Sequence, residues 1–253
     1  MIYVIFGLHK SGTTLTARLL HEAGIDMGPE THGDSYDAGD LFERPQTKAI
    51  NKQLLGVEHD KWLRTYPHHS LCVDPDLRSC ANRLVDRLAV TGGDWGFKDP
   101  RTVLTYGFWA EVLPPHKVIA IYREPSALWP RTRRPFGRKW HQNPRRAYEL
   151  VARWLEHNGR MGAIVRRNPE SSLLLSYDRL MDDPAELDRL RAFVERPLPD
   201  RREPGLRRGR AAWTPLLRAV RPFAEARLGT RVDTVMAELE ALRAQQIQND
   251  WGL

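Results

Sequence analysis

The chain has 253 residues, of which 41 % are hydrophobic, so it can bury a substantial core as one large α/β domain or as one domain with a helical appendage. No apolar run approaches the roughly 20 residues that a membrane-spanning helix needs, and the first apolar segment has the wrong flanks for a signal peptide, so we expect a cytoplasmic protein without a membrane span. The formal net charge of +7 suits nucleic acid, a membrane surface or a phosphorylated cofactor, and Cys72 and Cys80 indicate neither a disulfide framework nor a structural metal site.

The first segment is predicted to form a strand, a glycine loop and a helix. Residues 2–6 are apolar and mostly β-branched or aromatic, which is typical of a buried strand, and a helix is predicted from Leu15. Between them, Gly7 and Gly12 keep the GxxxxG frame of a phosphate-binding P-loop. In such a loop, backbone N–H groups and the positive end of the helix dipole both face an anion.

The lysine of this loop stands at an unusual place. An ordinary P-loop has its lysine directly after the second glycine, but Thr13 occupies that position, and the lysine of this loop is Lys10. From there it can reach the oxygen that joins a phosphate to its leaving group. The predicted phosphate cradle consists of His9, Lys10, Ser11, Gly12, Thr13 and Thr14.

Short apolar strands alternate with amphipathic helices along the rest of the chain. Further strands are predicted around residues 95–99, 117–122 and 172–177. Helical spacing covers residues 50–55, 76–90, 102–113, 147–155, 184–194 and 211–248, and we expect the last of these to be broken at Gly229. Residues 28–40, 126–143 and 196–210 are predicted to be loops, and residues 58–75 are not assigned.

The alternation favours an α/β fold, with a P-loop-type parallel β-sheet flanked by helices on both faces and a helical C-terminal part. No linker divides the chain, so residues 1–253 are predicted to form a single domain. Polar residues follow several predicted strands at the edge where open parallel sheets bind ligands. These are Lys10, Lys98-Asp99-Pro100-Arg101, Arg123-Glu124-Pro125 and Tyr177-Asp178.

Taken in this order, the motifs resemble those of P-loop sulfotransferases, in particular the bacterial branch. The loop from Gly7 to Thr14 (GxxKSGTT) resembles the family's 5′-phosphosulfate loop. Other similar segments are WGFKDPR (95–101), VIAIYREP (118–125) with the family's RxP element, residues 148–158 with Trp154 and Asn158, and LSYDRLMDDPAELDRLRAFV (175–194). These motifs span most of the chain.

The resemblance implies 3′-phosphoadenosine 5′-phosphosulfate (PAPS) as donor, adenosine 3′,5′-bisphosphate as product and no metal. Lys10 is then the catalytic residue that stabilises the leaving phosphate, and Arg123 contacts the 3′-phosphate. Tyr177 belongs to the cofactor-binding residues. Arg207, Arg208 and Gly209 resemble the late basic loop that closes over the 3′-phosphate, although a solvated arginine run has the same composition.

The sequence departs from the family pattern at the 3′-phosphate site. The family usually has a serine eight positions after the RxP arginine, but here that position is Arg131. An arginine can bind phosphate with two parallel hydrogen bonds, so Arg131 is predicted to bind the cofactor. Ser126 and Thr132 are alternative substitutes for the missing serine.

A second departure concerns the catalytic base. Many cytosolic members of the family have a catalytic histidine two residues after the lysine of the second motif, where this chain has Pro100. Glu43 is the first candidate for the base and Asp99 the second. Each has a structural alternative, Glu43 as a helix N-terminal carboxylate and Asp99 as a cap or ion-pair partner. Four histidines in predicted loops are further candidates by pKa, namely His9, His32, His68 and His69.

We therefore predict a PAPS-dependent sulfotransferase that acts on a hydroxyl or amine of a small-molecule or glycan acceptor and binds no nucleic acid. A P-loop kinase or NTPase is the alternative enzyme, with Asp178 as the magnesium-binding carboxylate, but its lysine after Gly12 is missing. An arginine-rich nucleic-acid-binding protein would explain the charge but not the Lys10 loop. The sequence indicates neither the acceptor nor the oligomeric state.

Overall fold

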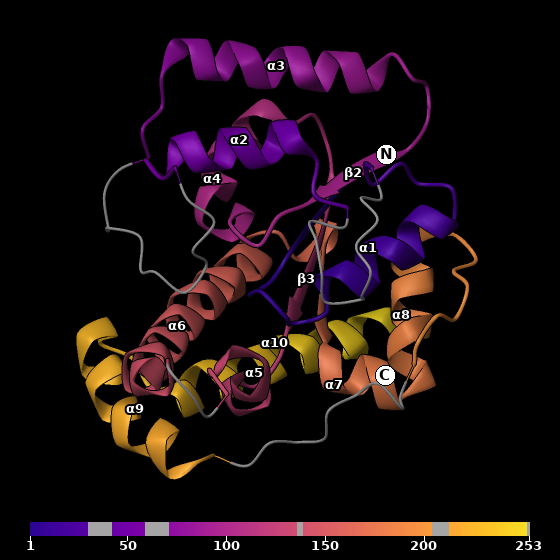
Figure 1. Cartoon of the computed structure of the whole chain (residues 1–253). Helices are drawn as coiled ribbons and strands as arrows, with labels where there is room; N and C mark the ends of the chain where they lie inside the picture. Colours follow the sequence, from indigo (N-terminus) through magenta and orange to yellow (C-terminus); the bar gives the residue numbers. More distant parts are fainter. Residues whose placement is uncertain (30–41, 59–70, 136–138, 204–212, 252–253) are drawn as a thin grey trace.

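A computed structural model describes residues 1–29, 42–58, 71–135, 139–203 and 213–251 (Figure 1). Four parallel strands form one sheet in the order β2-β1-β3-β4. The strands are β1 (Ile2–Phe6), β2 (Trp95–Lys98), β3 (Lys117–Tyr122) and β4 (Ser172–Ser176). The carboxyl ends of all four strands therefore meet at one edge of the sheet, as the sequence predicted.

Helices cover both faces of this sheet, and the predicted α/β fold is confirmed (Figure 1). They are α1 (Thr13–Glu22), α2 (Pro45–Leu54), α3 (Pro75–Ala89), α4 (Thr102–Val112), α5 (Pro125–Thr132), α6 (Asn143–Arg167), α7 (Tyr177–Asp182), α8 (Pro184–Val194), α9 (Pro215–Leu228) and α10 (Val232–Trp251). Gly229 ends α9 with φ of 65°, a left-handed conformation that suits glycine, so the predicted break in the last helical region is confirmed. Within the described ranges, no helix is both long and apolar enough to cross a bilayer.

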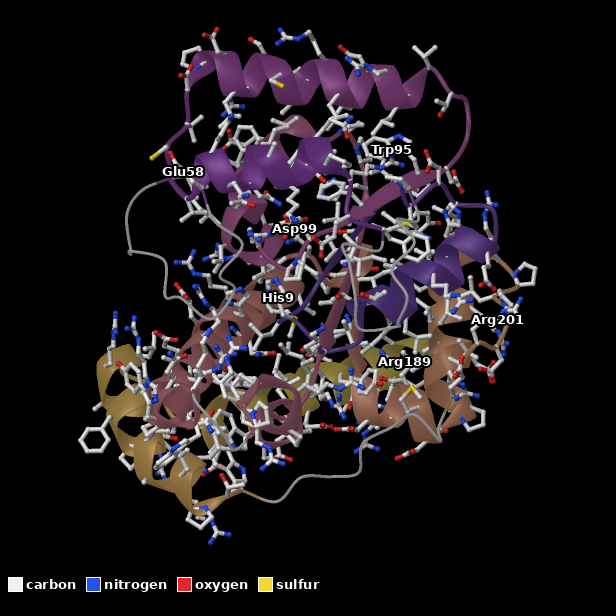
Figure 2. All side chains as sticks on the ribbon, in the orientation of Figure 1. His9, Glu58, Trp95, Asp99, Arg189 and Arg201 are labelled. Atoms are coloured by element: carbon white, nitrogen blue, oxygen red, sulfur yellow. The ribbon has the colours of Figure 1, made fainter. Side chains whose placement is uncertain are left out.

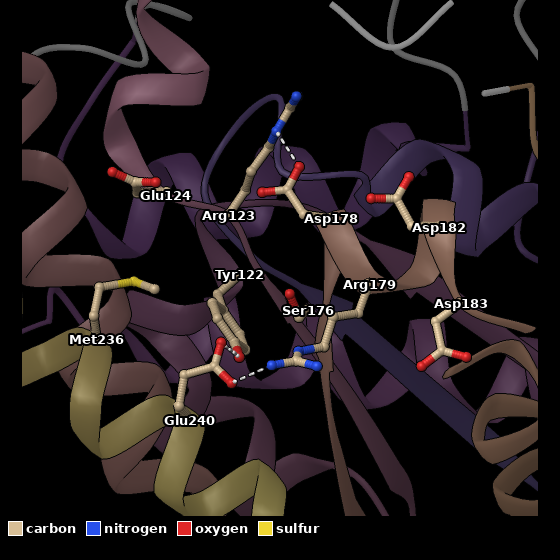
Figure 3. Close-up of a pocket in the computed structure, with 10 residues that line it drawn as sticks. All are labelled: Tyr122, Arg123, Glu124, Ser176, Asp178, Arg179, Asp182, Asp183, Met236 and Glu240. Atoms are coloured by element: carbon tan, nitrogen blue, oxygen red, sulfur yellow. Dashed lines mark hydrogen bonds and ion pairs between the residues drawn. The ribbon is translucent and has the colours of Figure 1, made fainter. Parts of the chain in front are cut away.

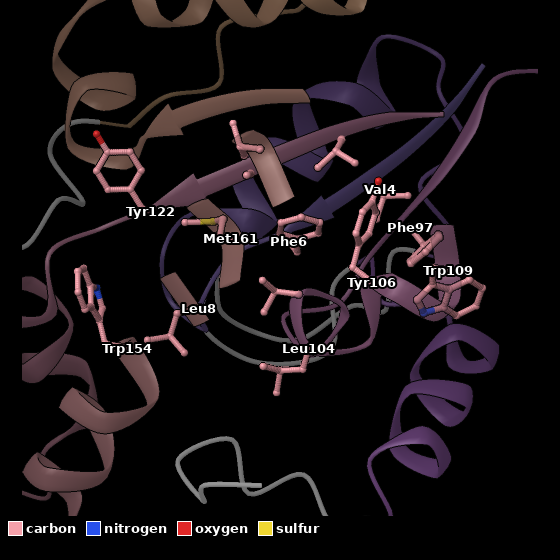
Figure 4. Close-up of a cluster of buried hydrophobic side chains, with 14 of the residues drawn as sticks. Val4, Phe6, Leu8, Phe97, Leu104, Tyr106, Trp109, Tyr122, Trp154 and Met161 are labelled. Atoms are coloured by element: carbon pink, nitrogen blue, oxygen red, sulfur yellow. The ribbon is translucent and has the colours of Figure 1, made fainter. Parts of the chain in front are cut away.

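The sheet separates two apolar layers, because successive side chains of a strand point to opposite faces. In β1, Val4 and Phe6 face the layer that contains α2, α3, α4, α6, α9 and α10 (Figure 4). Tyr3 and Ile5 face the layer that contains α1, α7 and α8. Every residue of β1 is buried as a result, and this explains its uninterrupted apolar sequence.

Side chains from two helices satisfy the outer edge of β4. The amide of Leu174 donates to Gln246 Oε1 at 2.9 Å, and Gln246 Nε2 donates to the carbonyl of Ser172 at 2.7 Å. The amide of Ser176 donates to Glu186 Oε1 at 2.9 Å. These contacts give α8 and α10 a defined register on the sheet and occupy backbone groups that an open edge would offer to another strand.

Two short helices were not predicted from the sequence. α5 lies in a region that was predicted to be a loop because of its prolines, but Pro125 stands at the helix start, where proline is tolerated, and Pro130 lies inside the helix. α7 follows β4 directly and begins with Tyr177. Both helices start at the carboxyl edge of the sheet, so they carry residues of the candidate site.

Candidate functional site

The loop after β1 passes very close to β3. A Cβ atom on Gly7 would lie 2.2 Å from the carbonyl oxygen of Ile121, so no other residue fits there without a shift. The amide of Ser11 donates to the carbonyl of Leu8 at 3.0 Å and closes a turn. Lys10 adopts φ of 70° and Gly12 φ of 101°, both in the left-handed region. The loop is therefore curled in front of the first helix, as a phosphate cradle requires.

The N-terminus of α1 is open to an anion. Among the residues that the structure describes, no side chain caps this helix and its first turn has no acidic residue. The amides of its first residues, Thr13 and Thr14, lack the capping bonds that usually satisfy such groups. The Ser11 hydroxyl is buried and has no hydrogen-bond partner in the described part of the chain. This arrangement supplies donors but no acceptor that a phosphate would compete with.

Arg123 lies beside this loop, at the carboxyl end of β3. Its backbone is fixed because Trp154 Nε1 donates to its carbonyl at 2.7 Å. Its guanidinium carbon lies 4.4 Å from the ring centroid of Tyr177, and its Nε lies 3.7 Å from Asp178 Oδ1. The structure therefore brings Arg123 together with Tyr177, whose ring packs against Gly12 of the loop.

A cavity of about 380 Å³ adjoins Arg123 at the ends of β3 and β4 (Figure 3). On one side Asp178 points toward Arg123, and on the other Tyr122 and Arg179 point toward Glu240 of α10 (Figure 3). Five carboxylates and two arginines line it, namely Glu124, Asp178, Asp182, Asp183, Glu240, Arg123 and Arg179. With this excess of negative charge, the cavity itself is a poor site for phosphate, which the loop amides suit better.

Glu43 lies between two lysines. Lys98 Nζ donates to Glu43 Oε1 at 2.8 Å, and Lys48 Nζ lies 3.9 Å from Glu43 Oε2. The next residue, Arg44, holds the segment against β2 because its Nε donates to the carbonyl of Gly96 at 2.8 Å. The first candidate base is thus placed next to the end of β2, where it pairs with Lys98 and lies near Lys48.

Asp99, the second candidate base, is fully buried. Its Oδ1 accepts from the amide of Arg101 at 2.8 Å and from the Arg101 guanidinium at 3.2 Å. Its Oδ2 accepts from Asn51 Nδ2 at 3.0 Å, and Asn51 Oδ1 accepts from Trp109 Nε1 at 2.8 Å. These bonds tie the turn before α4 to α2, which matches the structural alternative of an ion-pair partner.

Sequence reasoning missed a group of buried polar residues on α6. Arg153 is fully buried, and its NH1 donates to Glu156 Oε2 at 2.8 Å. His157 is also buried, and its Nδ1 lies 3.1 Å from the carbonyl of Arg153. A carbonyl can only accept, so Nδ1 carries the proton in the neutral ring. The sequence does carry a signal for this group. Glu156 and His157 follow Arg153 at helical spacings of three and four, so they lie on one side of α6, in addition to its apolar residues.

The pKa values of two histidines in or near this group are lowered. Desolvation of the ring, followed by the charge of Arg101, keeps the pKa of His9 well below its ordinary value. Burial and then the charge of Arg153 do the same for the pKa of His157. His157 also contributes to the lowered pKa of His9. Figure 2 labels His9 and Asp99 near the middle of the molecule.

The two hydroxyls considered as substitutes for the family's serine are engaged elsewhere. Ser126 Oγ donates to Glu124 Oε1 at 2.9 Å, and Thr132 Oγ1 donates to the carbonyl of Leu128 at 2.8 Å. A phosphate dianion needs donors, and each hydroxyl has only one proton to give. Arg131, in the last turn of α5, is the remaining candidate at this position.

Several predicted residues lie outside the described part of the chain. Arg207, Arg208 and Gly209 of the late basic loop belong to residues 204–212, and three of the candidate histidines, His32, His68 and His69, lie in residues 30–41 and 59–70. Within the described ranges, no group of three or more histidine, cysteine, aspartate or glutamate side chains is arranged to hold a metal ion.

A family model described as the sulfotransferase family matches residues 3–200. Among solved structures, the chain is similar to a sulfotransferase domain from the curacin biosynthetic pathway, with 16 % identity, a TM-score of 0.48, and coverage of 87 % of this chain and 82 % of that one. It is also similar to sulfotransferase STF9 from Mycobacterium avium, with 14 % identity, a TM-score of 0.45, and coverage of 98 % and 76 %. No curated protein matches the sequence.

Proposed function

Because the chain belongs to the sulfotransferase family, we propose that it transfers a sulfuryl group from PAPS to a hydroxyl or amine of a small-molecule or glycan acceptor. The observation that carries this proposal is the loop after β1, in which Lys10 adopts a left-handed conformation shortly before a helix N-terminus that no described side chain caps. Family membership supports sulfuryl transfer in general, and the loop chemistry supports this donor.

The loop residues fit a phosphosulfate group in three respects. The amides at the start of α1 have no side-chain cap within the described residues, and the buried Ser11 hydroxyl has no partner there. Gly7 and Gly12 let the loop curl where a Cβ would collide with its surroundings. In this proposal the amides of Thr13 and Thr14, together with the hydroxyls of the loop, hold the 5′-phosphate.

Lys10 is the residue that we assign to the chemical step. PAPS supplies an activated sulfuryl group, and its transfer leaves negative charge on the oxygen that joined the sulfur to the phosphate. The Lys10 ammonium, held inside the loop rather than after it, neutralises that charge, and the helix dipole of α1 acts in the same direction. A compact ammonium can approach one oxygen closely, which suits this role.

Arg123 and Arg131 are assigned to the 3′-phosphate. Arg123 is nearly buried and held at the carboxyl end of β3, so its charge is strongly felt by a nearby anion. Arg131 takes the place of the family's serine, because Ser126 and Thr132 give their protons to other acceptors. The late loop with Arg207, Arg208 and Gly209 is assigned to the same phosphate from the resemblance alone.

Glu43 is the base in this proposal. Its carboxylate lies at the end of β2 beside Lys98 and Lys48, and in this role it accepts the proton of the acceptor group. Asp99 is fully buried and both of its oxygens accept hydrogen bonds, which favours a positioning role under Arg101 and Asn51. We therefore propose that Asp99 holds Arg101 and Asn51 in place and is not the base.

The rival functions are less well supported by the contacts. A P-loop kinase needs a carboxylate for magnesium, but Asp178 lies beside the guanidinium of Arg123. For a nucleic-acid-binding protein the arginines should face solvent without acidic partners, yet many described arginines pair with carboxylates. Examples are Arg44 with Asp26, Arg78 with Glu111, Arg191 with Asp188 and Arg221 with Asp233.

Thermal unfolding with three ligands separates these functions. We expect adenosine 3′,5′-bisphosphate to raise the melting temperature more than ATP with magnesium or a short oligonucleotide. Calorimetry then compares adenosine 3′,5′-bisphosphate with AMP, which lacks the 3′-phosphate. Each charge-assisted contact contributes roughly 1.5–3 kcal/mol, so the bisphosphate should bind at least about 10-fold more tightly. Equal affinities would contradict the assigned donor.

A further inference from the structure

Tyr177 occupies the space between the phosphate loop and Arg123. It is the first residue of α7, directly after β4, and its side chain is almost fully buried. A Cβ atom on Gly12 would lie only 2.2 Å from Tyr177 Cδ2, so the ring packs directly against the loop backbone. The ring also contacts the Arg123 guanidinium, whose carbon lies 4.4 Å from the ring centroid.

The ring is therefore one member of a continuous row. Gly12 belongs to the loop after β1, Arg123 follows β3, and Tyr177 follows β4, so three strands contribute to it. Arg123 is held at its backbone by Trp154 and near its Nε by Asp178. Within the described part of the chain, the Tyr177 hydroxyl makes no hydrogen bond, so the packing contacts of this residue with the protein come from its ring.

We propose that Tyr177 is a positioning residue whose ring fixes the distance between the phosphate loop and Arg123, and that this spacing selects a nucleotide with both a 5′- and a 3′-phosphate. The inference rests on the proposed function and deepens it. An aromatic ring suits the task because it is rigid and has only two rotatable bonds. Its face also attracts the guanidinium electrostatically, which holds Arg123 in one orientation.

Gly12 is explained by the same contact. Its φ of 101° already favours glycine, and the close approach of the Tyr177 ring leaves no space for a side chain. The second phosphate-loop glycine is therefore needed both for the curl of the loop and for the contact with Tyr177. A change in the ring would move the loop and Arg123 relative to each other, since both pack on it.

Two substitutions separate the ring from the hydroxyl. Tyr177→Phe keeps the ring, and Tyr177→Met replaces it with a flexible apolar chain. Calorimetry measures the affinity of each variant for adenosine 3′,5′-bisphosphate and for AMP. We expect Tyr177→Phe to keep both affinities within about twofold. Tyr177→Met should weaken the bisphosphate by roughly 10-fold and AMP by less than about threefold, the scale of one lost cation–π contact.

Each other outcome overturns the inference. If Tyr177→Phe loses as much bisphosphate affinity as Tyr177→Met, the hydroxyl binds the nucleotide. If Tyr177→Met loses both ligands equally, or neither, the ring does not set the spacing. Tyr177→Leu provides a second ring-free variant should Tyr177→Met not fold, as judged by its thermal transition. A wild-type protein that binds AMP as tightly as the bisphosphate contradicts the proposed function itself, before any variant is considered.

Discussion

At the scale of single residues, Lys10 combines a backbone cost with a chemical role. A lysine in the left-handed region, here with φ of 70°, is less stable than a glycine there by about 1 kcal/mol. The lysine stands in the middle of the loop, between Gly7 and Gly12. A glycine would relax the loop but carry no ammonium, so the strain is consistent with a requirement for the side chain.

Lys10→Ala should lower turnover by roughly 10²–10³-fold, the scale of removing one preorganised donor to a developing charge. Because that charge grows only in the transition state, the affinity for adenosine 3′,5′-bisphosphate should fall by much less. Donor hydrolysis or reverse transfer from an aryl sulfate measures the rate, and calorimetry measures the affinity. Lys10→Gly is the matched control: it should lose the same activity while being at least as stable as Lys10→Ala. An unchanged rate in Lys10→Ala would contradict the assigned role.

At the scale of elements, the last helix, α10, bonds to the edge strand of the sheet. α10 lies outside the matched residues 3–200, yet Gln246 bonds to β4 and Glu240 lines the cavity beside Arg123. A buried ion-pair cluster fixes this helix, since Arg243 NH2 donates to Glu186 Oε2 at 2.6 Å. Burial raises the pKa of Glu186, but the hydrogen bonds from Arg243 and the Ser176 amide outweigh it, and the pKa lies below its ordinary value.

Glu186→Ala should destabilise the protein by about 3–5 kcal/mol, because Arg189 and Arg243 lose the buried carboxylate that they share. Glu186→Gln keeps an acceptor for the Ser176 amide and should cost less, about 1.5–3 kcal/mol. Urea unfolding measures both values. Equal stability of Glu186→Ala and the wild type would show that α10 docks without this cluster.

The elements that could be predicted are those set by local sequence. β1, β3 and β4 are apolar runs, and the end of α9 at Gly229 follows from the glycine, so their positions were predicted to within one or two residues. The loop after β1 was predictable because its glycines are required by close contacts. α5 was missed because Pro130 lies inside it, and an internal proline usually ends a helix. Pro125, at the first helical position, favours a helix start, but this signal is weaker than the opposite one from Pro130.

At the scale of the whole molecule, the buried charges of α6 could not be predicted. Arg153 and His157 are buried because α6 lies between α9, α10 and the sheet, and this layering is a tertiary property. The same holds for Tyr177, whose contacts with Gly12 and Arg123 join three strands that are distant in sequence. A sequence pattern predicts which element a residue belongs to, but contacts between elements depend on how the layers pack.

The buried histidines make the stability of the whole molecule sensitive to acid. The pKa of His157 lies well below its ordinary value because of burial and the charges of Arg153, Arg160 and Arg101, and His9 lies in the same field. The unfolded chain binds these protons at pH values below about 6.5, whereas the folded state does not. The contribution of these neutral histidines to the free energy of unfolding is therefore fully present above about pH 6.5. It is lost as the pH decreases toward their lowered pKa values in the folded state.

His157→Gln should flatten this acid dependence, because it removes one of the groups that must charge on unfolding. Between pH 7 and pH 5 the wild type should lose up to about 2 kcal/mol more stability than the variant, the linkage value for one proton over that range. Urea unfolding at several pH values measures the difference, and this window lies above the range in which Glu186 titrates. His141→Gln, at an exposed position just before α6, controls for the loss of a histidine as such. Parallel stability profiles for the wild type and His157→Gln would show that His157 is charged in the folded protein, contrary to the environment that Arg153 and Arg101 create.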